Sequence, residues 1–225
     1  MTMFADRQDA GRRLATALLR FKDVHPVVLA LPRGGVPVGF EIAERLAAPL
    51  DIILVRKIGA PGFEELAIGA IAEGTPIERV LEHDTIRELE IPQDYLERQI
   101  ARQSQEIDRR RTVYRQNRAA TGVNGGTAIV VDDGIATGAT MRAALRAVRR
   151  QAPRQLVMAV PVAAPQTLEA LRGEADEIVC LAAPEPFDAI SLFYAEFHQL
   201  KDEEVTDLLA RAAARRTPRG PARQP

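Results

Sequence analysis

Two adjacent carboxylates and a run of small residues with two hydroxyl groups form the most informative segment of the sequence. A wholly apolar run ends in Asp132 and Asp133, and the segment 134–140 (GIATGAT) follows directly. A turn of small residues lets successive backbone N–H groups converge on one anion, and Thr137 and Thr140 can add hydroxyl donors. A helix that begins there would add about half a positive charge. The segment has the chemistry of a phosphate cradle beside two acids.

An acid pair beside an anion cradle indicates a ligand that carries both an anionic group and hydroxyl groups. A sugar phosphate meets this description, because the loop amides take the phosphate while ribose hydroxyls donate to Asp132 and Asp133. The loop contains no Lys, so it differs from the phosphate loop of nucleoside triphosphatases, and it lacks the three-glycine dinucleotide fingerprint. The alternative is an ordinary strand–turn–helix connection with acidic capping.

Two basic residues follow other apolar runs. Arg33 lies in the segment 31–35 (LPRGG), where Gly34 and Gly35 permit a close backbone approach to a ligand. A plain strand–helix turn explains this segment equally well. Lys57, one of three lysines in the chain, ends the next apolar run and precedes a Gly/Pro-containing stretch. Both are candidates for contact with an anionic ligand.

Apolar runs that alternate with helical patterns must position these residues. The runs predicted as strands are 27–31, 52–55, 66–72, 127–131, 156–162 and 177–181. The predicted helices are 6–21, 36–46, 92–118, 141–150, 165–171 and 201–212. Strands that are apolar on both faces predict a parallel sheet covered on both sides by helices. Because ligands bind beyond the carboxyl ends of parallel strands, we expect Arg33, Lys57 and the two aspartates at one edge of the sheet.

The long helix predicted at 92–118 carries two patterns. Its apolar stripe has nearly heptad spacing, is interrupted by Gln103, and consists of Leu96, Ile100, Ile107 and Tyr114. A packing seam or subunit contact is the favoured interpretation. Its arginines spread around the helix: Arg98, Arg102, Arg109, Arg110, Arg111, Arg115 and Arg118. A solvated surface is therefore favoured over a nucleic-acid-binding face.

Composition narrows the class of protein. The chain has 225 residues, 46% of them hydrophobic, and a formal net charge of −1, so it gives no general attraction to nucleic acid or anionic membrane. Its single cysteine, Cys180, excludes an intramolecular disulfide and a cysteine-based zinc cluster, and its apolar neighbours predict a core position. No apolar run approaches the roughly 18 residues of a membrane span. Residues 1–20 lack the apolar region of a signal peptide, so we expect a cytoplasmic protein.

The segment 130–140 resembles the motif that binds 5-phosphoribosyl-1-diphosphate (PRPP) in type I phosphoribosyltransferases: an apolar strand, two acids and a Thr-Gly-x-Thr loop. In the same chain order, 31–35 is similar to the pyrophosphate loop of that family. The segment 55–62 is similar to its basic residue and closing loop. The whole arrangement also resembles bacterial phosphoribosyltransferase-like proteins of unassigned acceptor. The resemblance implies an α/β, Rossmann-like parallel-sheet core with helices on both faces.

The resemblance also implies roles for individual residues. Asp132 and Asp133 would hold the ribose hydroxyls, and the 5-phosphate would be bound by Ala136, Thr137, Gly138, Ala139 and Thr140. The diphosphate would contact Arg33, Gly34, Gly35 and Lys57. The residues expected to take part in catalysis are Lys57, Arg33 and Asp133. The implied cofactor is Mg²⁺, held mainly by PRPP, with Asp132 and Asp133 as the candidate side-chain ligands.

Family members place a variable hood over the acceptor base, and the segment 183–200 corresponds to it. Phe187, Phe193 or Tyr194 would stack on the base, with a hydrophobic core cluster as the equal alternative. Members that act on 6-oxopurines carry an acid just before the Thr-Gly pair. Ala136 stands there in this chain, which disfavours hypoxanthine and guanine and leaves adenine-like, orotate-like or other acceptors open.

We expect a single domain over residues 1–214, with a core at about 22–182, a helical insertion at about 84–120, and the hood followed by a closing helix. Residues 215–225, rich in Pro and Arg, are expected to be disordered. The expected partners are PRPP and a small-molecule acceptor, in a homodimer without membrane or nucleic acid.

Three functions stay open. The favoured one is a Mg²⁺-dependent transfer of the phosphoribosyl group from PRPP to a nucleobase-like acceptor with release of pyrophosphate. The second is a PRPP-sensing regulatory protein of the same fold, for which the arginine-rich helix is the candidate nucleic-acid surface. The third is a sugar-phosphate hydrolase or phosphorylase on this scaffold. The acceptor, the general base and the role of helix 92–118 are left open by the sequence.

Overall fold

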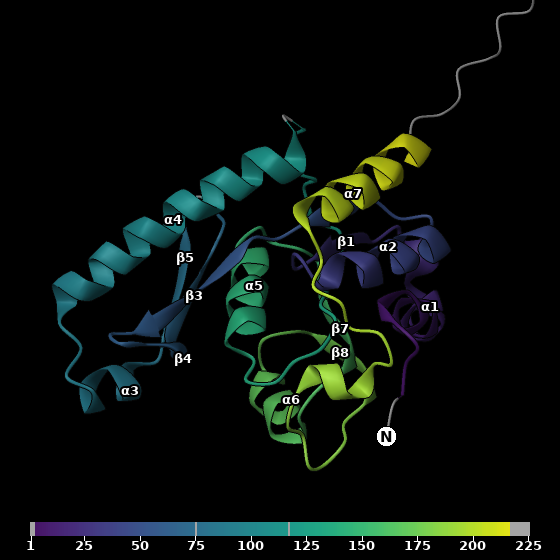
Figure 1. The fold of residues 1–225 in the computed structure, drawn as a ribbon. Coiled ribbons are helices and arrows are strands. Elements are labelled where there is room, and N and C mark those ends of the chain that lie inside the picture. Colours follow the sequence, from purple (N-terminus) through teal and green to yellow (C-terminus); the bar gives the residue numbers. More distant parts are fainter. Residues whose placement is uncertain (1–2, 75, 117, 217–225) are drawn as a thin grey trace, which may run out of the picture.

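A parallel sheet forms the centre of the molecule (Figure 1). The computed structural model describes residues 3–74, 76–116 and 118–216. In spatial order the strands of this sheet are β2 (Leu50–Ile52), β1 (Val27–Ala30), β6 (Thr127–Val131), β7 (Gln155–Val162) and β8 (Glu177–Ala182). The chain adds β2 on one side of β1 and β6 on the other, so the direction of the strand order reverses between β1 and β6.

Helices cover both faces of this sheet. One face carries α1 (Arg7–Ala17), α2 (Gly35–Leu46) and α7 (Asp202–Arg216), and the other carries α5 (Ala139–Arg149) and α6 (Pro165–Leu171) (Figure 1). Alternate residues of one strand enter different cores: Val28 packs in the α1–α2–α7 core and Leu29 in the α5–α6 core. Burial on both faces explains why the strands read as continuous apolar runs. The predicted α/β class is confirmed.

A second, antiparallel sheet contains the predicted strand 66–72 and the end of the predicted strand 52–55. It consists of β3 (Val55–Ala60), β4 (Phe63–Ala72) and β5 (Glu78–Leu81). The run 52–55, predicted as one strand, divides between β2 and β3, and the run 66–72 lies in β4. Only Pro61 and Gly62 connect β3 to β4, and a parallel pair needs a crossover of a dozen or more residues. The short turn therefore makes an antiparallel hairpin, and the sequence-based assignment was wrong here.

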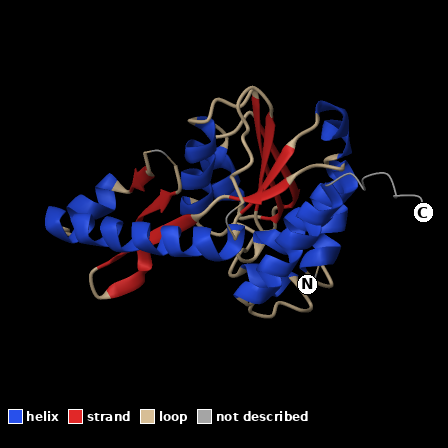
Figure 2. Cartoon of the chain, turned by 90° about the horizontal axis from the view of Figure 1, so that it is seen from above, coloured by secondary structure: helices blue, strands red, loops and turns tan. Residues whose placement is uncertain are grey.

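Two helices follow the second sheet. They are α3 (His83–Glu88), which the sequence did not predict, and α4 (Gln93–Arg115), which lies along the second sheet and reaches α7 (Figures 1 and 2). The apolar stripe of α4 is buried within the chain, as the packing-seam interpretation predicted. At its C-terminal end the Tyr114 hydroxyl donates to the Asp202 carboxylate at 2.5 Å.

Arg115 corrects the prediction of a wholly solvated set of arginines on this helix. Its side chain is buried, pairs with Asp51 at 3.1 Å and forms two hydrogen bonds with Glu73 at 2.7 and 2.8 Å. It also donates to the carbonyl of Ile52 at 2.8 Å. Arg115 thus fastens the end of α4 to the edge of the parallel sheet.

The N-terminal segment meets the segment after β8 beside the sheet. A short 3₁₀ segment, Ile190–Phe193, follows β8, and Phe4 forms a bridge with Tyr194. Residues 215 and 216, expected in a disordered tail, belong to α7, and the remainder of that tail lies outside the described residues. In the described part of the chain, no helix has the length and apolar character needed to cross a membrane.

Candidate functional site

The loops after β1 and β6 touch at the carboxyl edge of the sheet, where the strand order reverses. A Cβ atom added to Gly34 would lie 2.1 Å from Asp133 Oδ2, and one added to Gly35 would lie 2.6 Å from the carbonyl oxygen of Val131. Only glycine fits such a close approach. Parallel α/β sheets bind their ligands at this kind of reversal point. The structure therefore brings the segment 31–35 and the acid pair together.

The loop that leads into α5 presents unpaired backbone donors. Among the described residues, the amides of residues 136–140 have no hydrogen-bond acceptor. Ala136 and Thr137 are exposed, and Gly138 adopts a left-handed φ of 81° just before the helix. Thr167 Oγ1 of α6 donates to the carbonyl of Ala136 at 2.5 Å and so holds the loop from its outer side. Free amides at a helix N-terminus form a cradle for an anion.

Asp133 is engaged in a buried ion pair, which the sequence did not predict. Its Oδ2 lies 2.7 Å from Arg7 Nε of α1, and both side chains are largely buried. Arg7 also donates to the carbonyl of His198 at 2.9 Å, and its guanidinium carbon lies 3.8 Å from the centre of the Phe197 ring. The Tyr194 hydroxyl donates to the carbonyl of Asp133 at 2.5 Å. Asp133, one of the two acids assigned to the ribose hydroxyls, therefore already has a cationic partner within the chain.

No local sequence pattern identifies Arg7 as the partner of Asp133. It is one of several charged residues in an amphipathic N-terminal helix, and 126 positions separate it from Asp133 in the sequence. Their contact results from the packing of α1 beside the carboxyl edge of the sheet.

Asp132 differs from Asp133 in its environment. Its side chain is half-buried, and its Oδ1 accepts from the backbone amide of Asp133 at 2.9 Å. Burial raises the pKa of Asp132 well above its usual range, and the neighbouring charge of Asp133 raises it further. Burial also raises the pKa of Asp133, while Arg7 opposes that shift. The two acids thus differ in their surroundings: Asp133 has a cationic partner, whereas Asp132 has none among the described residues.

Arg33 lies between the acid pair and the start of α7. Its side chain is about one-third exposed, and its Nη1 lies 3.9 Å from Asp202 Oδ1. The backbone amides of Arg33 and Gly34 have no acceptor among the described residues. The turn therefore offers both a loosely held guanidinium and free amides at this edge.

Lys57 occupies a different position from the predicted one. It lies within β3, opposite Ala70 of β4, and lines a cleft between β3 and α4. The expectation of a lysine at the end of a parallel strand was wrong, because β3 belongs to the second sheet. The expected flexible stretch after it is the rest of β3 and the hairpin turn.

The aromatic residues of the predicted hood divide into two kinds. Phe193 and Tyr194 are buried in a cluster with Phe4, so the core alternative holds for both. Phe187 is half-buried, and its ring centre lies 5.1 Å from that of Phe193. A Cβ added to Gly134 would lie 2.6 Å from Ile190 Cγ2, so the hood segment lies directly over the loop after β6.

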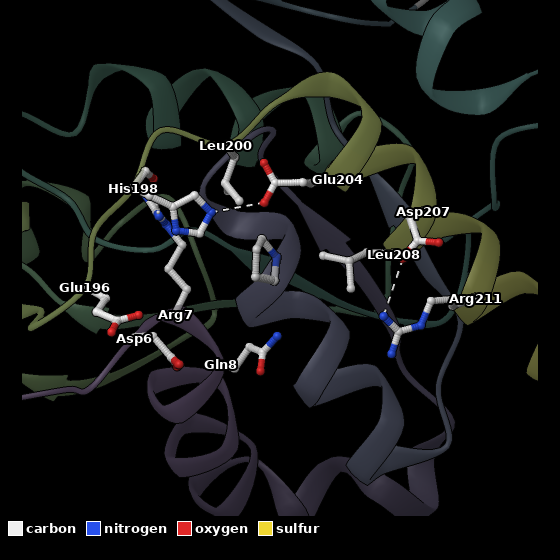
Figure 3. A pocket seen from close by; sticks show the side chains of 11 residues that line it. Asp6, Arg7, Gln8, Glu196, His198, Leu200, Glu204, Asp207, Leu208 and Arg211 are labelled. Atoms are coloured by element: carbon white, nitrogen blue, oxygen red, sulfur yellow. Dashed lines mark hydrogen bonds and ion pairs between the residues drawn. The ribbon is translucent and has the colours of Figure 1, made fainter.

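A pocket of about 280 Å³ lies on the far side of Arg7, between α1, α2 and α7 (Figure 3). Its cationic groups already have acidic partners: Arg7 pairs with Asp133, and Arg211 lies 3.4 Å from Asp207. His198 lies 3.0 Å from Glu204, as Figure 3 shows. None of the described residues that line this pocket is an uncommitted cation, so the pocket does not resemble a phosphate site.

Comparison with known proteins identifies one family. The family model "Phosphoribosyl transferase domain" matches residues 5–191. A protein named "Putative phosphoribosyl transferase", from two strains of Mycobacterium tuberculosis, is 43% identical over 212 residues, which cover 94% of this chain and 47% of that protein. The chain thus spans about half the length of the curated relatives that it matches.

Solved structures share the fold. The crystal structure of TT1426 from Thermus thermophilus has 45% sequence identity and a TM-score of 0.79, and the match covers 93% of this chain and 99% of that one. A hypothetical protein from Neisseria gonorrhoeae with bound ppGpp has 13% identity and a TM-score of 0.50, over 94% of this chain and 97% of that one. The second likeness concerns the fold alone.

Proposed function

The chain belongs to the phosphoribosyl transferase family, and from this premise we propose that it is a Mg²⁺-dependent enzyme that uses PRPP. It transfers the 5-phosphoribosyl group to a small, nucleobase-like acceptor and releases pyrophosphate. The single observation that carries this proposal is the row of unpaired amides at 136–140 beside Asp132, where the strand order reverses. A ligand with a phosphate and adjacent ribose hydroxyls satisfies both groups.

The 5-phosphate end of PRPP is bound by the loop after β6. The amides of Ala136, Thr137, Gly138, Ala139 and Thr140 donate to it, and the hydroxyls of Thr137 and Thr140 add further donors. Asp132 and Asp133 accept from the ribose hydroxyls, with Arg7 fixing the orientation of Asp133. Because Arg7 acts through Asp133, it is a positioning residue.

The diphosphate end of PRPP is bound by the turn after β1. Negative charge develops on the diphosphate when the C1–O bond breaks, and this turn stabilises it. The stabilising groups are the free amides of Arg33 and Gly34, the backbone at Gly35, which has no side chain, and the guanidinium of Arg33. Lys57 adds a second cation. The bonding electron pair leaves with pyrophosphate, a ring nitrogen of the acceptor forms the new bond to C1, and the proton of that nitrogen passes to pyrophosphate or to water. The protein contributes orientation and charge stabilisation.

The residues present fit a magnesium ion held mainly by the substrate. The described residues contain no group of three or more His, Cys, Asp or Glu that could hold a metal. Mg²⁺ commonly takes one or two carboxylates together with substrate phosphates and water. Asp132 is the available carboxylate, since Asp133 is paired with Arg7. When bound, the ion supplies neutralisation of the diphosphate charge.

The acceptor site is proposed beside Ala136 and the hood. Ala136 is exposed and offers no acid to a base, which favours acceptors other than 6-oxopurines. Phe187 is the aromatic of the hood that stacks on the acceptor, because Phe193 and Tyr194 are committed to the core. A homodimer and a cytoplasmic location stay predictions from the sequence.

The charges on α4 favour the transferase over a nucleic-acid-binding regulator. Arg98 pairs with Asp94 at 2.5 Å, Arg109 and Arg110 both pair with Glu106 at 2.7 Å, and Arg111 pairs with Asp108. These pairs remove much of the positive potential that a phosphate backbone would need.

The test combines binding with product analysis. Calorimetry with PRPP and Mg²⁺ should give one tight site per chain, and a panel of nucleobases should include one that releases pyrophosphate. Ribose 5-phosphate formed without an acceptor would instead identify a hydrolase. Absence of PRPP binding would remove both activities.

A further inference from the structure

The first turn of α6 reaches the loop after β6 through one side chain, Thr167. Its Oγ1 donates to the carbonyl oxygen of Ala136 at 2.5 Å, across 31 positions of the sequence. A hydroxyl near the start of a helix commonly caps that helix, yet the N-cap residue of α6, Ala164, makes no side-chain hydrogen bond. The hydroxyl of Thr167 therefore serves the loop after β6 and not the helix that carries it.

The connection between β7 and α6 holds Thr167 at this position. Ile135 of the loop forms a parallel bridge with Ala163. The amide of Ala164 donates to the carbonyl of Ile135 at 3.1 Å, and the amide of Thr167 donates to the carbonyl of Ala164, also at 3.1 Å. A Cβ added to Gly138 would lie 2.7 Å from Thr167 Cγ2, so the methyl group also lies against the loop. The backbone thus sets where both groups of this side chain act.

The hydrogen bond to Ala136 fixes the direction of the next amide. The peptide between Ala136 and Thr137 is trans and planar, so its C=O and N–H groups point in opposite directions. Since the carbonyl is held on the side of α6, the N–H of Thr137 points away from α6, and it has no acceptor among the described residues. A carbonyl oxygen cannot donate to a phosphate, so a flipped peptide would remove one donor from the cradle.

We propose that Thr167 is a positioning residue for phosphate binding: by holding the Ala136 carbonyl, it keeps the Thr137 amide directed at the 5-phosphate of PRPP. This inference rests on the proposed function and adds to it a residue from outside the loop. The benefit is preorganisation, because binding then does not have to order this peptide. The hydrogen bond also polarises the peptide and strengthens its N–H group as a donor.

Thr167→Val tests the proposal, because valine keeps a methyl group against Gly138 and lacks the hydroxyl. Calorimetry of the full chain measures its affinity for ribose 5-phosphate and, separately, for PRPP with Mg²⁺. Loss of one hydrogen bond to a charged group should weaken the binding of both ligands by about tenfold. Thr167→Ser keeps the hydroxyl and should restore most of the lost affinity. Unchanged affinities in Thr167→Val would overturn the proposal.

Amide NMR spectra separate the positioning of Thr137 from a general loss of structure. In the wild-type chain, ribose 5-phosphate should shift the amide proton of Thr137 downfield, because a hydrogen bond to phosphate deshields it. Thr167→Val should lose this shift even when saturated with ligand, and Thr167→Ser should retain it. A shift of the same size in the saturated valine variant would contradict the proposal, since the amide would then reach the phosphate without Thr167.

Thr112→Val is the matched control, because Thr112 Oγ1 donates to the carbonyl of Asp108 at 3.1 Å on an exposed turn of α4. It should leave both affinities unchanged. An equal loss of affinity in Thr112→Val and Thr167→Val would assign the effect to any lost hydroxyl and would refute the specific role of Thr167. If Thr167→Val lowers the Tm more than Thr112→Val does, Thr167→Ala repeats the test with a smaller side chain.

The wild-type titration separates failure of this inference from failure of the proposed function. If the wild-type chain binds PRPP and ribose 5-phosphate and Thr167→Val binds them equally well, only the role of Thr167 is removed. If the wild-type chain binds neither ligand, the proposed function and the role of Thr167 are removed together.

Discussion

Arg7 Nε lies 2.7 Å from Asp133 Oδ2, and this buried pair joins the first helix to the loop that follows the central strand β6. The contact keeps the carboxylate of Asp133 in one orientation, because Phe197 and the carbonyl of His198 hold the guanidinium on its other sides. The N-terminal helix and the segment after β8 therefore both contribute to the geometry of the acid pair.

Replacement of Arg7 should lower the stability of the fold. Arg7→Gln leaves Asp133 buried without its counter-charge, and we expect the free energy of unfolding to fall by about 3–5 kcal/mol. Urea denaturation measures this loss. Arg13→Gln, in an exposed pair with Asp9 on the same helix, should change stability by less than about 1 kcal/mol.

The double variant Arg7→Gln with Asp133→Asn distinguishes the ion pair from packing. Neither partner is then left charged, so the double variant should be more stable than Arg7→Gln alone. If the double variant instead loses as much stability, relative to the wild type, as the two single variants together, the ion pair contributes little. Arg7 would then stabilise the fold through its contacts with Phe197 and His198.

The raised pKa of Asp132 gives a pH dependence of definite sign. A carboxyl group with a folded-state pKa above its unfolded value binds a proton more tightly when folded, so its contribution to stability falls as the pH rises through the folded pKa. Above about pH 4 the wild-type chain should therefore lose stability relative to Asp132→Asn. Denaturation at pH 5 and pH 8 should show the difference widening at the higher pH.

The same substitution should abolish PRPP binding, because the amide cannot replace the carboxylate as an acceptor on both oxygens. Asp94→Asn, at an exposed position of α4, should leave both PRPP affinity and the pH dependence unchanged. If Asp132→Asn is more stable than the wild type but no longer binds PRPP, Asp132 lowers stability and is needed for binding. If the stability of the wild type and of Asp132→Asn depended on pH in the same way, the raised pKa assigned to Asp132 would be refuted.

Gly34 should tolerate no side chain. The methyl group of Gly34→Ala would lie 2.1 Å from Asp133 Oδ2, and Arg7 restrains that carboxylate. We expect a stability loss of about 1–3 kcal/mol together with a loss of PRPP affinity. Gly173→Ala, where no atom lies within 4 Å of the added methyl, is the matched control. Unchanged PRPP binding in Gly34→Ala would argue against a diphosphate site at this turn.

Phe187 and Phe193 should separate acceptor binding from folding. Phe193→Ala removes a buried ring and should lower stability by about 3–5 kcal/mol. Phe187→Ala should lower it less, since that ring is half-buried, and should raise the KM for the acceptor while the affinity for PRPP stays constant. Steady-state kinetics with a base that supports pyrophosphate release provides the readout. An unchanged acceptor KM would place the base elsewhere.

Local sequence patterns were sufficient for the elements that carry the phosphate loop. The strand β6 is a continuous apolar run, and its two acids, the small residues and the start of α5 are adjacent in the chain, so no long-range information was needed. The pairing of the loops after β1 and β6 followed from the parallel sheet, whose carboxyl ends share one edge.

The rest depended on contacts that a local pattern does not contain. The place of Lys57 changed because the two-residue turn at 61–62 makes a hairpin, and the run 66–72 looks the same in either kind of sheet. The ion pair of Arg7 joins residues 126 positions apart. The burial of Phe193 and Tyr194 depends on Phe4 at the other end of the chain. The sequence shows which residues are apolar and which are charged. Tertiary packing decides which residues they contact, and a local pattern does not contain that information.

A crystal structure of the chain with PRPP and Mg²⁺ tests the central claim most directly. We predict that the 5-phosphate lies within hydrogen-bond distance of the amides of residues 136–140 and that a ribose hydroxyl donates to the carboxylate of Asp132. A 5-phosphate bound anywhere else, with those amides still without an acceptor, would contradict this prediction.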